Sequence, residues 1–161
     1  EGNLSDSERL RLLSGFNLEL DQIEAGVPID QLTLRPWFGP LAGVIRQYGL
    51  PVQLFRDLLS AFAQDVTTKR YGTYTDLLDY CRRSANPIGR LLLTLYRRTD
   101  VATCAQSDAI CTAMQLVNFW QDVAIDLAKG HEASVSVVSV TITTASGTWR
   151  TAIVTSARFR R

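Results

Sequence analysis

The feature that most constrains this chain is the segment 107–129, which contains neither proline nor glycine and is followed by Gly130, a common helix stop. We expect one long helix here. Most of its second half is apolar, but four polar side chains share an arc of about 80° at 100° per residue: Gln115, Asn118, Asp122 and Asp126. The apolar surface is too wide for a helix that faces solvent on one side, so we expect the polar stripe to line a cleft between helices.

Two of these polar residues have the spacing of metal ligands. Asp122 and Asp126 would lie about 6 Å apart along the helix axis, with their side chains stacked one turn above the other. Such oxygen ligands suit Mg²⁺, which takes one or two carboxylates and completes its shell with water and phosphate. The simpler interpretation is a solvated helix face, because acidic pairs four residues apart are common on protein surfaces. With the apolar flanks and Asn118 one turn earlier, the residues alone leave both interpretations open.

The rest of residues 1–130 is also predicted to be helical. A capping box, Ser5 to Glu8, starts a helix whose apolar positions continue at helical spacing to Gly26. Further helices are expected between glycine and proline stops, at about 38–48, 51–69, 74–83 and 88–96. Residues 99–106 are expected to be a connection into the long helix. No strand alternation occurs before residue 130, so the predicted fold class of this part is all-α.

The composition changes at His131. Eleven of the last 31 residues are Ser or Thr and none is Leu, whereas residues 1–130 contain 21 leucines. Residues 135–144 are β-type with some alternation, so a strand or hairpin is one interpretation. We prefer the other, in which the tail is irregular and does not belong to the fold. The chain is therefore divided into a helical domain, 1–130, and an atypical Ser/Thr/Val/Arg-rich tail, 131–161.

Composition and charge exclude several classes of protein. The net charge of +1 gives no attraction towards nucleic acid. Cys81, Cys104 and Cys111 lack metal-ligand spacing and are expected to be reduced, buried thiols. The one histidine, His131, lies at the start of the tail, which argues against His-dependent catalysis. Without a membrane-spanning apolar run or a signal peptide, we expect a cytoplasmic protein.

A second block lies at residues 79–93, Asp-Tyr-Cys-Arg-Arg-Ser-Ala-Asn-Pro-Ile-Gly-Arg-Leu-Leu-Leu. It predicts a helix interrupted at a proline, with small side chains at Ser84, Ala85 and Gly89. Small residues let a second helix or a ligand approach the backbone closely. From these residues alone, tight helix packing is the preferred interpretation.

Together the two blocks resemble the squalene/phytoene synthase family, the head-to-head prenyl synthases. Residues 115–126, Gln-Leu-x-Asn-x-x-x-Asp-x-x-x-Asp, are similar to the family's second acidic motif. The family's block around the prenyl pocket is matched by Tyr80, Cys81, Ala85 and Gly89, while Ser84, Asn86 and Pro87 depart from its more usual residues. The form Ser-Ala-Asn-Pro-x-Gly-Arg, with Gln121 before the first aspartate, most resembles the squalene or hydroxysqualene synthases of bacterial hopanoid biosynthesis. Upstream, Asp65, Arg70 and Tyr71 resemble the family's Asp-then-Arg-Tyr segment.

The resemblance implies a helical bundle of the isoprenoid synthase type. It also implies Mg²⁺-dependent ionisation of farnesyl-derived (presqualene) diphosphate to squalene or hydroxysqualene. The implied metal ligands are Asn118, Asp122 and Asp126, and the implied catalytic residues are the two aspartates and Tyr80, which would face the reacting carbons. Gln115 and Gln121 would lie near the diphosphate. The residues implied to shape the prenyl pocket, each of which could instead be ordinary core, are Ser84, Ile88, Gly89, Leu92, Ile110 and Met114.

The resemblance is incomplete, because the family's first acidic motif, Asp-x-x-x-Asp, does not precede Tyr80. We therefore expect an incomplete bundle that is inactive by itself. A phytoene synthase is the alternative within the family. A non-catalytic helical module that binds a partner or a lipid is the alternative of another class. The expected partner is a prenyl diphosphate, with peripheral membrane contact and oligomeric state left open.

Overall fold

The computed structural model describes residues 4–28, 38–68, 71–128, 134–144 and 147–158, with side chains described up to residue 119. The body consists of helices, as predicted. Their bounds are α1 (Asp6–Glu24), α2 (Phe38–Tyr48), α3 (Val52–Thr67), α4 (Tyr74–Ser84), α5 (Asn86–Leu95) and α6 (Val101–Ala128). Two strands follow, β1 (Ser134–Thr144) and β2 (Gly147–Arg158).

The helix starts follow the capping signals of the sequence. At α1 the backbone N–H of Glu8 donates to Ser5 Oγ (3.3 Å), and the N–H of Ser5 donates to Glu8 Oε2 (2.8 Å). Thr73 and Asp76 form a second capping box at α4. Helices α4 and α5 are separated at Ala85, and Pro87 lies in the first turn of α5, where the missing N–H costs no hydrogen bond. The predicted break at the proline is therefore confirmed, with α5 beginning two residues earlier than expected.

The predicted connection at 99–106 is wrong, because α6 begins at Val101. The side chain of Asp100 accepts a hydrogen bond from the backbone N–H of Thr103 (2.9 Å) and so caps the first turn. Aspartate is a favoured residue at such a cap. No glycine or proline in the sequence marks this helix start, since residues 90–129 contain neither. The helix is 28 residues long and carries positions 118, 122 and 126 without a break.

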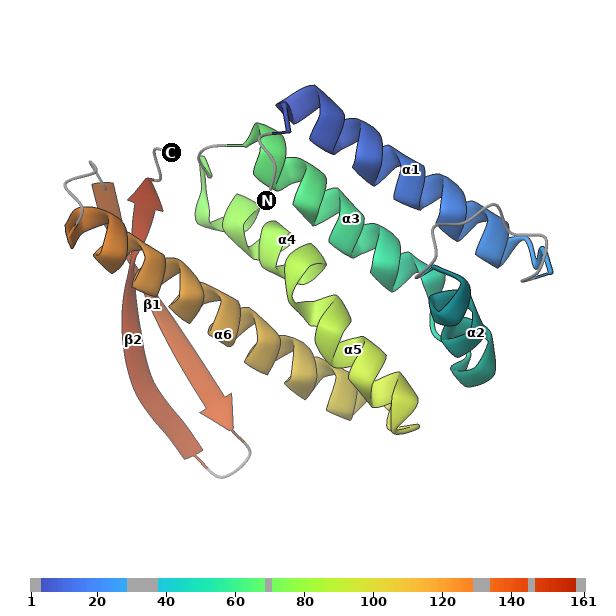
Figure 1. Cartoon of the computed structure of the whole chain (residues 1–161). Helices are drawn as coiled ribbons and strands as arrows, with labels where there is room; N and C mark the ends of the chain where they lie inside the picture. Colours follow the sequence, from blue (N-terminus) through green and yellow to red (C-terminus); the bar gives the residue numbers. More distant parts are fainter. Residues whose placement is uncertain (1–3, 29–37, 69–70, 129–133, 145–146, 159–161) are drawn as a thin grey trace.

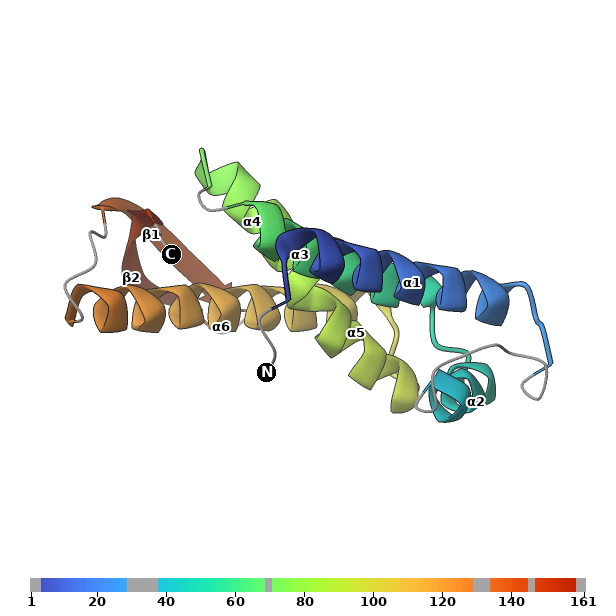
Figure 2. The same cartoon turned by 45° about the horizontal axis from the view of Figure 1, so that its top comes forward.

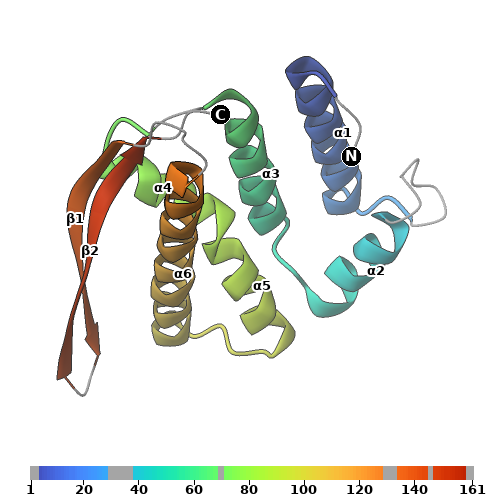
Figure 3. The same ribbon diagram turned by 60° about the vertical axis from the view of Figure 1, so that its left-hand side comes forward.

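The helices lie in a row, in the order α1, α3, then α4 with α5, then α6, and α2 crosses the end of α1 and α3 (Figures 1 and 3). In Figure 2, α4 rises away from α6, so these two helices diverge towards the C-terminal end of α6. Within the described residues, a core cluster of buried apolar side chains joins α1, α2 and the segment that leads into α3: Leu20, Ile23, Phe38, Ala42, Ile45 and Leu50. The core is thus concentrated at the end of the row away from α6.

Strands β1 and β2 form an antiparallel two-stranded hairpin, in which Ser134 pairs with Arg158 and Thr144 with Gly147. The register shifts between Val140 and Ile142. The hairpin lies alongside α6 and contacts it through β2 (Figures 1 and 3). Of our two interpretations of the tail, the structure therefore has the hairpin rather than the irregular segment. That residues 131–161 form a unit apart from the helical domain stays a prediction.

No helix in the described part of the chain is both long and apolar enough to cross a membrane.

Candidate active site

Tyr80 contacts two other residues that the sequence singled out, Asp65 and Tyr71. It lies on α4, is 6% exposed, and donates a hydrogen bond from its hydroxyl to Asp65 Oδ2 on α3 (3.0 Å). Burial, and then this hydrogen bond and the charge of Asp65, raise the pKa of the Tyr80 phenol, so it stays neutral at physiological pH. The neighbouring Cys81 is buried too, and burial raises the pKa of its thiol to about 12, which makes it unreactive.

A cluster of three aromatic rings, one of them that of Tyr80, connects α4 to the long helix. The ring centroids of Tyr80 and Tyr71 are 5.4 Å apart, those of Tyr80 and Phe119 are 5.7 Å apart, and those of Tyr71 and Phe119 are 5.9 Å apart. The two contacts of Phe119 are edge-on, a favourable geometry for aromatic pairs. Phe119 lies on α6 directly after Asn118, so this cluster fixes the start of the acidic motif against α4.

Helix α6 carries the predicted polar stripe on one continuous helix, which confirms that part of our prediction. The side chain of Asn118 is exposed, and that of Gln115 is half-buried. The side chains of Gln121, Asp122 and Asp126 lie outside the described residues, as does Arg70. That both carboxylates face the same cavity as Tyr80 stays a prediction.

Most of the residues predicted to shape a prenyl pocket lie on one open face. Ile88 and Leu92 on α5 are 48% and 51% exposed, and Ile110 and Met114 on α6 are 60% and 63% exposed. The two helices touch through Gly89, and the Arg90–Asp108 ion pair (2.6 Å) closes one flank of this contact. Helical periodicity puts the four apolar side chains together on the other flank. They form an open apolar face that ends on α6 one turn before Asn118, and they are not part of the core.

Gly89 itself lies at the helix contact rather than on the open face. A Cβ at this position would be 2.3 Å from Ser107 Oγ and 2.7 Å from Cys111 Sγ, so only glycine allows α5 and α6 to approach this closely. Tight helix packing, our preferred interpretation of the small residues from the sequence alone, therefore describes this position. Ser84, in contrast, lies one turn after Tyr80 with its hydroxyl buried.

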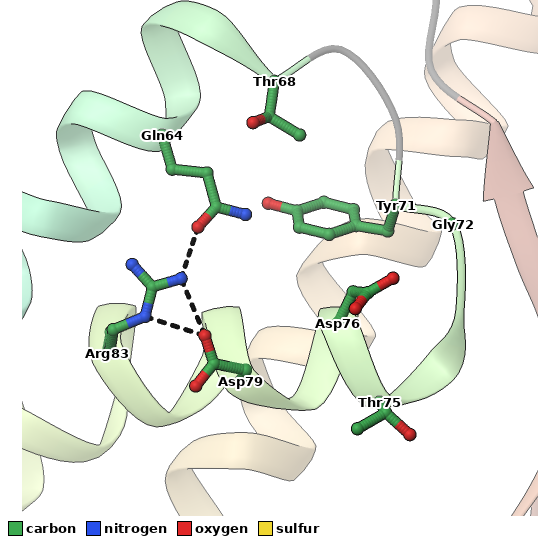
Figure 4. A pocket seen from close by; sticks show the side chains of 8 residues that line it. All are labelled: Gln64, Thr68, Tyr71, Gly72, Thr75, Asp76, Asp79 and Arg83. Atoms are coloured by element: carbon green, nitrogen blue, oxygen red, sulfur yellow. Dashed lines mark hydrogen bonds and ion pairs between the residues drawn. The ribbon is translucent and has the colours of Figure 1, made fainter.

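A pocket of about 370 Å³ lies elsewhere, between the end of α3 and α4 (Figure 4). Its lining residues are Gln64, Thr68, Tyr71, Gly72, Thr75, Asp76, Asp79 and Arg83. Arg83 donates to Gln64 and to Asp79 Oδ2 (2.9 Å), and Asp76 accepts from the backbone N–H of Thr73 at the start of α4, so these polar side chains already have partners within the protein. Neither this pocket nor the bond from Tyr80 to Asp65 was foreseen, although the sequence had singled out Asp65 and Tyr71.

Comparison with known proteins agrees with this arrangement. The model of the squalene/phytoene synthase family matches residues 3–133. A hydroxysqualene synthase of Sinorhizobium fredii is 41% identical over 78 residues, covering 48% of this chain and 26% of that protein. A phytoene synthase of Cereibacter sphaeroides is 32% identical over 90 residues, covering 56% of this chain and 25% of that protein.

Among solved structures, a squalene synthase from Alicyclobacillus acidocaldarius superimposes with a TM-score of 0.64 at 38% identity. The similarity covers 74% of this chain and 43% of that one. The body is thus the predicted helical fold of the isoprenoid synthases. The chain spans only 26% to 36% of the length of three hydroxysqualene synthases that it matches.

Proposed function

The chain belongs to the squalene/phytoene synthase family, and on that premise we propose that the protein carrying it is a prenyl-diphosphate synthase. Its proposed reaction converts a farnesyl-derived substrate, presqualene diphosphate, to squalene or hydroxysqualene. The observation that carries the proposal is the position of Asn118. It lies exposed on unbroken α6, between the open apolar face at Met114 and the ring of Phe119 that contacts Tyr80.

The metal ligands in this proposal are Asn118, Asp122 and Asp126. An amide and two carboxylates supply the oxygen donors that Mg²⁺ prefers, so the donor set fits this ion. Among residues with described side chains, no group of three or more His, Cys, Asp or Glu could hold a metal ion elsewhere. When bound, Mg²⁺ neutralises the charge of the departing diphosphate.

The other residues act on the prenyl chain and the reacting carbons. Ile88, Leu92, Ile110 and Met114 bind the hydrocarbon and exclude water from the cation that forms when diphosphate leaves. The buried, neutral phenol of Tyr80 presents its ring to that cation, whose charge an aromatic face stabilises. Gln115 and Gln121 bind near the diphosphate.

The test uses the whole protein and measures Mg²⁺-dependent diphosphate release from farnesyl and presqualene diphosphate. We expect Asp122→Asn to reduce turnover about 10²-fold or more, because a preorganised electrostatic contact to the leaving group is lost. Stability should change by no more than about 0.5 kcal/mol, since the substitution is nearly isosteric. Asp79→Asn is the matched control: this carboxylate lines the other pocket, and its loss should leave turnover within about twofold, the effect of a surface change.

Other outcomes separate the alternatives. Faster turnover of a longer prenyl diphosphate would favour a phytoene synthase. Absence of turnover with every prenyl diphosphate, with the fold intact by circular dichroism, would favour a non-catalytic helical module. Full activity of Asp122→Asn together with loss in Asp79→Asn would move the active site to the pocket between α3 and α4.

A further inference from the structure

The bond between Tyr80 and Asp65 links a buried phenol to an exposed carboxylate on another helix. Asp65 lies in the last turns of α3, 15 residues before Tyr80 on α4, and its Oδ2 is 3.0 Å from the phenol oxygen. A phenol has a single proton to donate. With that proton directed to Asp65, the phenol oxygen can act towards every other group only as an acceptor.

The ring is held from two more directions. Tyr71, which precedes α4, packs against it at a tilt of 55°, and Phe119 of α6 packs at 61°. Ring packing restricts the plane of the phenol, but a plane alone does not fix where the hydroxyl proton points. Within the described residues, Asp65 is the acceptor at 3.0 Å that fixes this direction.

We propose that Asp65 is a positioning residue, which holds the Tyr80 side chain at one place and one hydroxyl orientation against the reacting carbons. This inference rests on the proposed function. A carbocation reacts with whatever lone pair or base comes near it, so the orientation of the closest polar side chain determines how the cation is consumed. A misplaced Tyr80 would also admit water to the cation, which yields an alcohol in place of a hydrocarbon.

Position and charge can be separated by two substitutions of Asp65. Asp65→Asn keeps an oxygen in place and removes the charge, whereas Asp65→Glu keeps the charge and moves the acceptor by one methylene. If position is what matters, Asp65→Asn retains turnover within about threefold, and both Asp65→Glu and Asp65→Ala lose about ten- to a hundredfold in kcat, the scale of a small misplacement. The matched control is Asp57→Ala on the same helix, whose carboxylate accepts from Gln53 (2.8 Å), and it should leave kcat unchanged.

A double-variant cycle with Tyr80→Phe tests whether Asp65 acts through Tyr80. In the whole protein, with presqualene diphosphate and Mg²⁺, we expect Asp65→Ala to cause no further loss of kcat once Tyr80 is Phe. We also expect both single variants to shift the ratio of alcohol to hydrocarbon product in the same direction. A residue that only joins α3 to α4 would instead give additive losses and an unchanged product ratio.

Three results would overturn the inference: wild-type kcat in Asp65→Ala, additive losses in the cycle, or an active Asp65→Glu beside an inactive Asp65→Asn. The proposed function survives all three, because the wild-type protein still turns over its substrate. If circular dichroism shows that Asp65→Ala does not fold, the comparison of turnover in Asp65→Asn and Asp65→Glu still tests the inference. A folded wild-type protein without turnover would remove the proposed function and this inference together.

Discussion

At the scale of single residues, Gly89 shows how one missing methyl group sets the spacing of two helices. In Gly89→Ala the new Cβ would meet Ser107 Oγ and Cys111 Sγ at 2.3 and 2.7 Å, so α5 must move away from α6. We expect the free energy of unfolding to fall by about 1–3 kcal/mol, the usual cost of overpacking. Urea unfolding followed by circular dichroism measures this change.

The matched control for this substitution is Gly39→Ala. Gly39 also lies in a helix, α2, and a Cβ there would have nothing within 4 Å. Gly39 is in the first turn and precedes Pro40, so an alanine there gains little helix propensity. We therefore expect Gly39→Ala to change the free energy of unfolding by no more than about 0.5 kcal/mol. Equal effects of the two substitutions would show that helix propensity, and not contact with α6, governs position 89.

The candidate site residues could be predicted from the sequence better than the contacts between residues. The spacing of Asn118, Asp122 and Asp126 follows from helical periodicity alone, and α6 is indeed continuous through them. The hydrogen bond from Tyr80 to Asp65 depends on how α3 packs against α4, which no local pattern encodes. For Gly89 the small side chain did indicate tight helix packing, but its contacts with Ser107 and Cys111 could not be predicted, because they depend on how α5 packs against α6.

At the scale of elements, Arg83 of α4 forms several hydrogen bonds that connect this helix to α3. Arg83 has a side chain that is 15% exposed, and it donates to Asp79 on its own helix and to Ser60 (2.8 Å) and Gln64 on α3. We expect Arg83→Leu to lower the free energy of unfolding by about 1–3 kcal/mol, the range for losing charged hydrogen bonds. The amide protons of α4 should then exchange faster, which hydrogen-exchange mass spectrometry measures.

Arg82→Leu is the control for Arg83. Its side chain is 58% exposed, and its described ion pair is with Asp79 on its own helix (2.8 Å). Exposed pairs of this kind contribute at most about 1 kcal/mol, so this variant should stay close to the wild type. A larger loss in Arg82→Leu than in Arg83→Leu would contradict the view that Arg83 joins the two helices.

Element boundaries could be predicted where glycine or proline marks them, and less well elsewhere. Gly49 and Pro51 bound α2 and α3 as expected, because both residues disrupt a regular helix. The start of α6 was missed, since its signal is only a side-chain cap at Asp100 inside a stretch without glycine or proline. An aspartate does not identify a helix start by itself, because aspartate is also common in turns.

At the scale of the whole molecule, the hairpin lies at the end of the row that is farthest from the main core (Figure 1). A two-stranded sheet alone is marginally stable, and the segment 131–161 contains no leucine with which to form a helical core face. Its main described contact with the body is that of β2 with α6. Removal of the hairpin should therefore change the stability of the helical body little.

We expect deletion of residues 131–161 to change the free energy of unfolding by no more than about 0.5 kcal/mol, the scale of neutral surface changes. Urea unfolding of the full and shortened chains compares the two directly, and the helical signal per residue should rise because the deletion removes both strands and keeps helices α1 to α6. Circular dichroism of the same samples shows whether α6 stays helical without β2 beside it. A decrease of several kcal/mol would mean that the hairpin is part of the same cooperative unit, because its removal would then expose surface that folding normally buries.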